Sequence, residues 1–149
     1  SSGFDALPHT MDGCTTKENI LNPNPYVELL AYESMKLVFQ NLRTAAALPE
    51  SLDARWKVML GANMAGATLS AGTGATHGLA NMLSKYYHVP HGESVGMLLP
   101  YVMEYNIPCC PEKYARMAEA IGVRKDGMTD LEAAQREHTA GNPIGGCLT

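Results

Sequence analysis

The sequence predicts an all-α fold, arranged as a helical bundle. Apolar residues recur at helical spacing over long stretches, and the clearest run lies between residues 25 and 44. No segment shows the alternation of apolar and polar residues that a half-buried strand needs. Proline and glycine interrupt the helical runs, which favours several helices joined by short loops. A chain of 149 residues is long enough to bury the core of one such domain.

Composition and charge argue against nucleic acid or a membrane as a partner and against an oxidising environment. The formal net charge is −4, and the 11 basic residues are scattered, so no basic patch is available for nucleic acid or an anionic membrane surface. No stretch approaches the roughly 18 uninterrupted apolar residues of a membrane span, and the first residues lack a signal-peptide pattern. The four cysteines have no Cys-x-x-Cys spacing, so we expect a reducing, cytoplasmic setting.

The first half of the chain predicts three helices. The first covers residues 3 to 14, and it must begin near residues 3 to 5 because Pro8 is tolerated only in a first turn. A loop is predicted from Asn19 to Pro25. Asn24 then serves as the N-cap of a long helix that begins at Pro25 and runs to about residue 44.

A third helix is predicted after the break at Leu48-Pro49-Glu50, with Ser51 as its cap and a body from Ala54 to Leu69. Small residues dominate its second half and would allow another backbone to approach closely. We therefore predict a central, tightly packed helix. Trp56 and the methionines from Met59 to Met64 follow helical spacing, so we predict that they pack in the core and do not line a cofactor site.

The second half of the chain predicts four more helices. Gly72-Thr73-Gly74 forms a turn, and further prolines and glycines separate helices over residues 75 to 86, 93 to 105, 111 to 121 and 130 to 137. Residues 138 to 149 are glycine-rich and aperiodic. We therefore expect a helical domain over residues 1 to 137, followed by an irregular tail or a remnant of the C-terminal part of a longer chain.

Asp5, His9, His77 and His91 are candidate metal ligands. Asp5 and His9 are four residues apart, so on a helix both side chains project from one face. Such a pair also occurs as an ordinary surface hydrogen bond, so the spacing alone does not assign a metal. His77 and His91 begin two successive helices, and the alternative interpretation is a core histidine and a helix cap. A set of one carboxylate and three imidazoles suits Fe(II) or Zn(II), whereas Ca(II) and Mg(II) prefer oxygen ligands.

Ordered motifs along residues 3 to about 137 resemble the group III iron-dependent alcohol dehydrogenases. Gly3-Phe-Asp-Ala-Leu-Pro-His9 is similar to the family's Gly-x-Asp-Ala-Leu-Thr-His segment. Further matches to the family's motifs are His77-Gly-Leu-Ala-Asn81, Val89-Pro-His-Gly92, Leu98-Leu-Pro-Tyr-Val-Met-Glu-Tyr-Asn106 and Pro111-Glu-Lys-Tyr114. These motifs follow one another at the intervals that the family shows.

The resemblance implies a helical, metal-binding C-terminal domain of a two-domain dehydrogenase. Asp5, His9, His77 and His91 fall on the four positions that ligate Fe(II) in the family, with Zn(II) as the possible substitute. An N-terminal α/β domain would bind NAD or NADP opposite this metal, and we expect that domain to be absent from the chain. No glycine-rich dinucleotide fingerprint is present, because Gly72-x-Gly74 leads into His77 where a third glycine is needed.

The chain departs from the family at two positions near the ligands. Asn81 stands where the family usually has a second histidine, and an amide forms hydrogen bonds but takes up no proton. We therefore expect Asn81 to act in catalysis by orienting the substrate, with water carrying the proton away. Pro8 replaces the usual threonine next to His9, although it leaves Asp5 and His9 in register.

The expected function is the interconversion of a small primary alcohol or diol with its aldehyde, by hydride transfer to NAD or NADP. The alternative is a catalytically incompetent, truncated helical module that keeps the metal site. A helical metal-dependent hydrolase is disfavoured, because it would need an adjacent His-Asp pair and more carboxylates for a second ion. The resemblance also implies a homo-oligomer, and neither nucleic acid nor a membrane is an expected partner.

Overall fold

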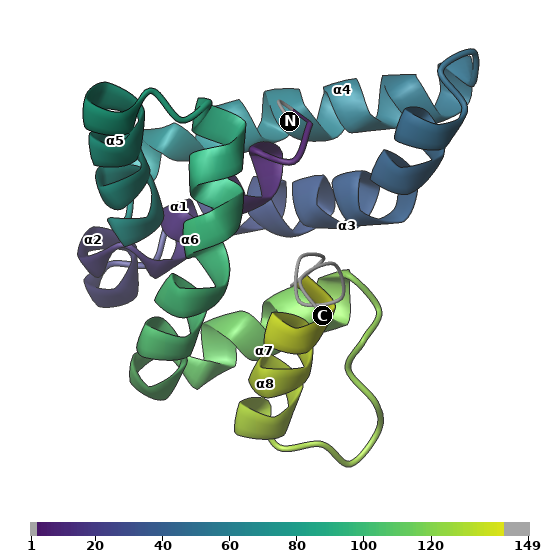
Figure 1. The fold of residues 1–149 in the computed structure, drawn as a ribbon. Coiled ribbons are helices and arrows are strands. Elements are labelled where there is room, and N and C mark those ends of the chain that lie inside the picture. The colour runs from purple at the N-terminus through teal and green to yellow at the C-terminus, as the bar shows by residue number, and fades with distance from the viewer. Residues whose placement is uncertain (1–2, 142–149) are drawn as a thin grey trace.

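The protein, described by a computed structural model over residues 3–141, is built from helices alone within that range (Figure 1). This confirms the predicted all-α class. The α-helices are α1 (Ala6–Thr15), α2 (Lys17–Leu21), α3 (Pro25–Ala47), α4 (Leu52–Thr68), α5 (Ala75–Tyr87), α6 (His91–Asn106), α7 (Pro111–Ala120) and α8 (Asp130–Gly141). Two short 3-10 helices, η1 (Leu69–Ala71) and η2 (Ile107–Cys109), follow α4 and α6. None of these helices is long and apolar enough to cross a membrane.

The helix α2 lies where the sequence predicted the start of a loop. The Thr16 hydroxyl caps it by accepting a hydrogen bond from the Asn19 N–H at 3.2 Å. The buried Asn19 side chain then donates to the Cys14 carbonyl at 3.2 Å and accepts from the Asn24 N–H at 2.8 Å. A helix of five residues is too short to show a hydrophobic period, so the prediction of a loop from Asn19 to Leu21 was wrong.

The helices α3 and α4 run side by side as the long pair of the molecule (Figure 1). Asn24 caps α3 as predicted, accepting from the Tyr26 N–H at 3.1 Å, whereas Ser51 begins α4 without a side-chain cap bond. At their crossing, a Cβ on Gly61 would lie 2.7 Å from Val38 Cγ2. The predicted close approach of another backbone to α4 is therefore present.

Two large side chains of α4 that the sequence predicted to lie in the core are exposed. Trp56 is 62% exposed and Met59 is 65% exposed, so the prediction that they pack in the core was wrong. The small residues of α4 face α3 because only they permit the short distance between the helices. Trp56 and Met59 are consequently turned outward, whereas Val58, Leu60 and Met64 are half-buried.

The helix α1 lies at the centre of the fold and packs against α3, α4, α5 and α6. Its apolar side, with Leu7 and Met11, joins the core cluster that also contains Met35, Leu99 and Tyr114. This packing turns the opposite, polar side of α1 toward the start of α5. The arrangement of the core thus determines which face of α1 is available for a polar site.

The C-terminal part of the described chain forms the pair α7 and α8, reached through α6 (Figure 1). A buried ion pair of Lys113 with Glu28 ties α7 to α3. The helix predicted for residues 130 to 137 continues to Gly141, and its His138 ring donates from Nε2 to the Pro100 carbonyl at 3.1 Å. Residues 138–141, which were predicted to be irregular, are therefore helical, and the rest of that predicted segment, residues 142–149, lies outside the described range.

Candidate metal centre

Two of the candidate ligands come from the start of α1. Asp5 is the N-cap residue of this helix and His9 follows one turn later. The buried Leu7 between them anchors the turn in the core, and the Thr68 hydroxyl of α4 donates to the His9 carbonyl at 3.2 Å. These contacts hold the first turn of α1 in place, so both ligand candidates project from a fixed backbone.

The third candidate is positioned by the glycine turn that precedes α5. Gly72 adopts a φ of +91°, which favours glycine, and the chain then passes so close to α1 that a Cβ on Gly74 would lie 2.7 Å from Asp12 Cγ. The helix α5 begins directly afterwards at Ala75, which places His77 in its first turn. The turn thus delivers His77 against the polar face of α1, and His77 is 4% exposed.

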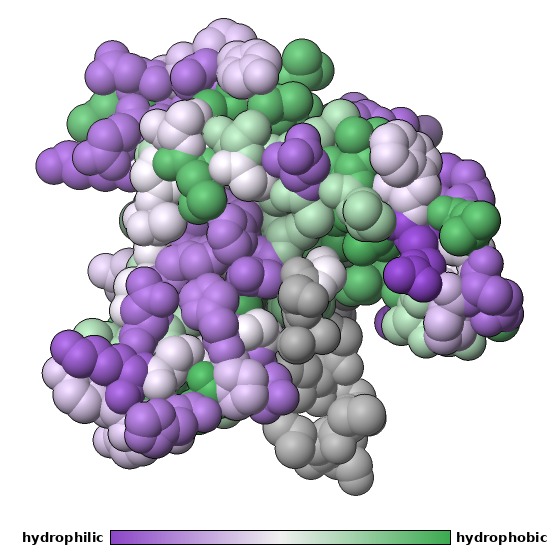
Figure 2. All heavy atoms as spheres, turned by 90° about the horizontal axis from the view of Figure 1, so that it is seen from above, coloured by the Kyte–Doolittle hydropathy of each residue, from purple (hydrophilic) through white to green (hydrophobic). Residues whose placement is uncertain are grey.

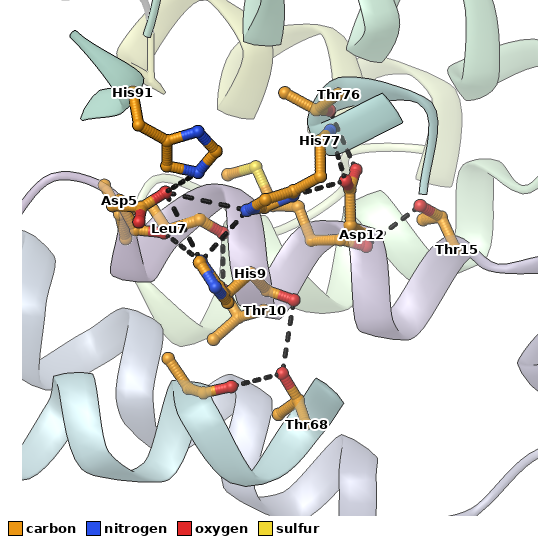
Figure 3. A network of polar contacts seen from close by, with 12 residues as sticks. Asp5, Leu7, His9, Thr10, Asp12, Thr15, Thr68, Thr76, His77 and His91 are labelled. Carbon is orange, nitrogen blue, oxygen red and sulfur yellow. Dashed lines mark hydrogen bonds and ion pairs between the residues drawn. The ribbon is translucent and has the colours of Figure 1, made fainter. Parts of the chain in front are cut away.

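The side chains of Asp5, His9 and His77 meet at one place (Figure 3). One donor atom of each lies within 4.8 Å of the others. Asp5 Oδ1 is 3.4 Å from His9 Nδ1 and 3.6 Å from His77 Nε2. His77 Nε2 is 3.1 Å from His9 Nδ1. Segments that are 68 residues apart in the sequence therefore supply a single cluster of nitrogen and oxygen donors.

The fourth candidate, His91, stands at the margin of this cluster. It is the first residue of α6, its side chain is 39% exposed, and its Nε2 lies 3.8 Å from Asp5 Oδ1. Its ring centroid is 5.6 Å from that of His77. The structure thus groups three of the predicted ligands tightly and places His91 within reach of the shared carboxylate.

The donors in this cluster fit a transition-metal ion. Bonds of about 2.1 Å at angles between 90° and 109° separate neighbouring ligand atoms by roughly 3.0 to 3.4 Å. The contacts among Asp5 Oδ1, His9 Nδ1 and His77 Nε2 lie between 3.1 and 3.6 Å, close to that spacing. Asp5 Oδ1 is also buried without a hydrogen-bond partner among the described residues. A buried carboxylate oxygen is costly in this state, and a cation would satisfy it.

A second carboxylate supports His77 from behind. Asp12 is 2% exposed, and it accepts hydrogen bonds from the Thr76 hydroxyl at 2.8 Å, the His77 backbone N–H at 3.2 Å and the His77 ring at Nδ1 at 2.8 Å (Figure 3). Burial alone would lower the pKa of His77, but the hydrogen bond and charge of Asp12, with Asp5 adding to them, raise it above its usual value.

The His9 ring forms a hydrogen bond with the backbone at the start of its own helix. Its Nδ1 lies 2.7 Å from the Asp5 carbonyl oxygen, which can only accept a hydrogen bond, so Nδ1 carries the proton in this contact. Metal binding requires an unprotonated nitrogen. Metal binding at Nδ1 would therefore use the other tautomer of the neutral ring, with the proton on Nε2, and the contact with the Asp5 carbonyl would be given up.

The exposed residues of α5 and its C-terminal end include Asn81, the residue expected to orient the substrate. Asn81 is exposed, one turn after His77 on α5. His88 is exposed as well and ends α5 in a left-handed conformation, with a φ of +55°. Tyr86 and Tyr87, the last two residues of α5, are 60% and 74% exposed.

Asp12 is the site residue that the sequence analysis missed. It lies seven residues after Asp5 and three after His9, so it shares their face of α1, and this spacing was the available signal.

The chain is thus a helical bundle with a partly buried Asp/His cluster, formed at the start of two helices, that could hold a metal ion. The Fe-containing alcohol dehydrogenase family, C-terminal, matches residues 1–141 of this chain. The chain belongs to that family.

Curated relatives have similar sequences over almost the whole chain. The 1,3-propanediol dehydrogenase of Citrobacter freundii is 35% identical over 136 residues, covering 91% of this chain and 34% of the relative. The lactaldehyde reductase of Escherichia coli strain K12 is 34% identical over 134 residues, covering 89% of this chain and 34% of the relative. The chain thus spans about a third of the length of the relatives it matches.

Solved structures show the same fold. A 1,3-propanediol oxidoreductase superposes with a TM-score of 0.89 at 33% identity, covering 96% of this chain and 37% of that one. An alcohol dehydrogenase from Oenococcus oeni superposes with a TM-score of 0.87 at 30% identity, covering 93% of this chain and 36% of that one. The described fold is therefore that of the C-terminal helical domain of this family.

Proposed function

We propose that this chain is the metal-binding domain of an NAD(P)-dependent dehydrogenase that interconverts a small primary alcohol or diol and its aldehyde. The observation that carries the proposal is the convergence of Asp5, His9 and His77 around a buried, unpartnered carboxylate oxygen. Membership of the iron-containing family favours Fe(II), and the mixed nitrogen and oxygen donors also suit Zn(II). Relatives named as dehydrogenases or reductases of small diols and aldehydes support the substrate class.

In this proposal the chain holds the ion and orients the substrate. Asp5, His9, His77 and His91 would bind the metal. When bound, the ion would supply Lewis acidity that lowers the pKa of a substrate hydroxyl group. Asn81 lies exposed one turn beyond His77, where its amide is free to donate or accept a hydrogen bond from a substrate. Because the amide takes up no proton, the substrate proton would leave through water.

Exposed apolar side chains on α5 and α6 support a role within a larger protein. Leu79, Met82 and Tyr86 are more than half exposed and follow one face of α5, and Met97, Tyr101 and Tyr105 do the same on α6. Apolar residues reach the surface in several places on the face seen from above (Figure 2). Such surfaces on the helices that carry His77 and His91 suit contact with a nicotinamide-binding domain or a second subunit.

Metal analysis of ligand variants tests the site. We expect the purified wild-type chain to hold metal and His77→Ala and His91→Ala to be metal-depleted, because losing one ligand typically costs orders of magnitude in affinity. His88→Asn is the control, since His88 is exposed and asparagine tolerates its positive φ. Stoichiometric metal in either alanine variant, measured by elemental analysis, would remove that histidine from the site.

A second candidate function is a helical metal-binding module without catalysis. The observation that favours it is that these 149 residues contain a cluster of metal-ligand side chains but no glycine-rich dinucleotide fingerprint. Hydride transfer separates the two candidates, because only the dehydrogenase reduces NAD or NADP with an alcohol substrate.

A further inference from the structure

We infer that Asp12 is the positioning residue for His77, an inference that rests on the proposed metal-binding function. Asp12 fixes the His77 imidazole in the tautomer with its proton on Nδ1, which leaves Nε2 unprotonated and turned toward Asp5 and His9. An imidazole in the other tautomer presents an N–H to the cluster and cannot bind an ion.

The hydrogen bonds determine this tautomer. An ionised carboxylate only accepts, so the 2.8 Å contact between His77 Nδ1 and Asp12 Oδ2 places the proton on Nδ1. The carboxylate cannot rotate away, because the Thr76 hydroxyl and the His77 backbone N–H donate to it as well. The neutral ring carries one N–H proton, so its Nε2 has a free lone pair that can bind a metal ion. This Nε2 lies 3.1 Å from His9 Nδ1 and 3.6 Å from Asp5 Oδ1.

Both α1 and the turn before α5 help to place Asp12 against His77. Asp5, His9 and Asp12 are spaced four and three residues apart, so one face of α1 carries two candidate ligands and the support for a third. Gly74 permits the approach, because a side chain there would overlap Asp12, with Cβ 2.8 Å from Oδ1. Asp12 is buried and close to the cluster, so it also adds a second negative charge that favours a cation.

The experiment reads the His77 tautomer and the metal affinity separately. Nitrogen-15 NMR of the histidine rings, on the metal-free chain at a pH where His77 is neutral, shows which ring nitrogen carries the proton. Titration with Co(II), followed by its absorption bands, gives the affinity. Asp12→Leu keeps the approximate shape and removes the acceptor. Asp12→Asn keeps an acceptor oxygen and removes the charge, and Thr76→Val removes one donor to Asp12 while leaving its carboxylate.

We expect the wild type, Asp12→Asn and Thr76→Val to carry the proton on Nδ1. In Asp12→Leu the proton should populate Nε2, and the Co(II) dissociation constant should rise about 10- to 100-fold. Asp12→Asn should fall between that variant and the wild type. This ordering separates positioning from a loss of folding, because the isosteric Asp12→Asn restores the tautomer.

Two outcomes would overturn the inference in distinguishable ways. Co(II) binding by a wild-type chain whose His77 carries its proton on Nε2 overturns the role of Asp12 and leaves the proposed function standing. Both measurements are made on the wild-type chain, so this outcome does not depend on whether any variant folds. A wild-type chain with the proton on Nδ1 that binds no Co(II) overturns the proposed function and, with it, the inference that rests on it.

Discussion

Glu137 of α8 carries a carboxyl group that the fold buries completely. Among the residues that the structure describes, neither of its oxygens has a hydrogen-bond partner. Burial disfavours the charged form, so the pKa of Glu137 lies well above the usual value of 4.5. The group therefore binds a proton more tightly in the folded chain than in the unfolded chain, which links stability to pH.

We expect Glu137→Leu to remove a pH dependence from the free energy of unfolding. Because the folded pKa is raised, the contribution of Glu137 to stability is fully present below about pH 4.5 and is lost as the pH rises toward the folded pKa. The loss amounts to at most about 1.4 kcal/mol per pH unit. Urea unfolding across this range should show the wild type losing stability relative to the variant. Glu137→Gln, which cannot ionise, should behave like Glu137→Leu, and equal slopes in all three chains would contradict the assignment.

The sequence indicated the four candidate ligands but did not indicate Asp12. Asp5, His9, His77 and His91 are residue types with ligand chemistry at helix starts, and the family motifs surround them. Asp12 is an ordinary acidic residue within a helix until α5 is placed against α1. The role inferred for Asp12 follows from a contact between residues 65 positions apart, and the sequence offers only the spacing of Asp12 from His9 as a sign of that contact.

At the scale of elements, two glycines of α4 differ in their distance from α3, and substitution of each can test how α3 and α4 pack. Gly61 faces α3, where an added Cβ would lie 2.7 Å from Val38 Cγ2 and 3.2 Å from the Ser34 carbonyl oxygen. Gly66 is exposed, and an added Cβ would meet nothing within 4 Å. The same substitution thus has opposite consequences five positions apart.

We expect Gly61→Ala to lower the free energy of unfolding by roughly 1 to 3 kcal/mol, because the neighbouring backbone oxygen cannot move aside cheaply. Gly66→Ala should raise it by about 0.5 to 1 kcal/mol, since alanine is the better helix former. Thermal or urea unfolding of both variants measures the two changes. A stabilised Gly61→Ala chain would mean that α3 and α4 lie further apart than described.

The helices that sequence reasoning placed well are those with long apolar periods and clear ends. Asn24 and Pro25 marked the start of α3, and the small residues of α4 indicated its close packing. Sequence reasoning failed where those signals were short or ambiguous. The helix α2 depends on a side-chain bridge through Asn19, and the apolar Trp56 resembled a core residue although it lies on the unpacked face of its helix.

At the scale of the whole molecule, we expect the isolated chain to transfer no hydride even when loaded with Fe(II) or Zn(II). Transfer needs a nicotinamide held against the bound alcohol, and the sequence has no glycine-rich loop to cradle its pyrophosphate. The assay follows NADH or NADPH formation from 1,3-propanediol, with a full-length propanediol dehydrogenase as the positive control. Robust, metal-dependent product from these residues alone would overturn this expectation.

The contact between His9 and His77 joins positions 68 residues apart, at the two ends of a segment that contains α2, α3 and α4. An ion bound by both rings would close that segment into a loop, as a disulfide does, and would reduce the conformational entropy of the unfolded chain while it stays bound. It would also prevent the first helix from fraying. The free metal concentration would then influence how long the folded chain survives proteolysis, because it determines the fraction of chains that hold the ion.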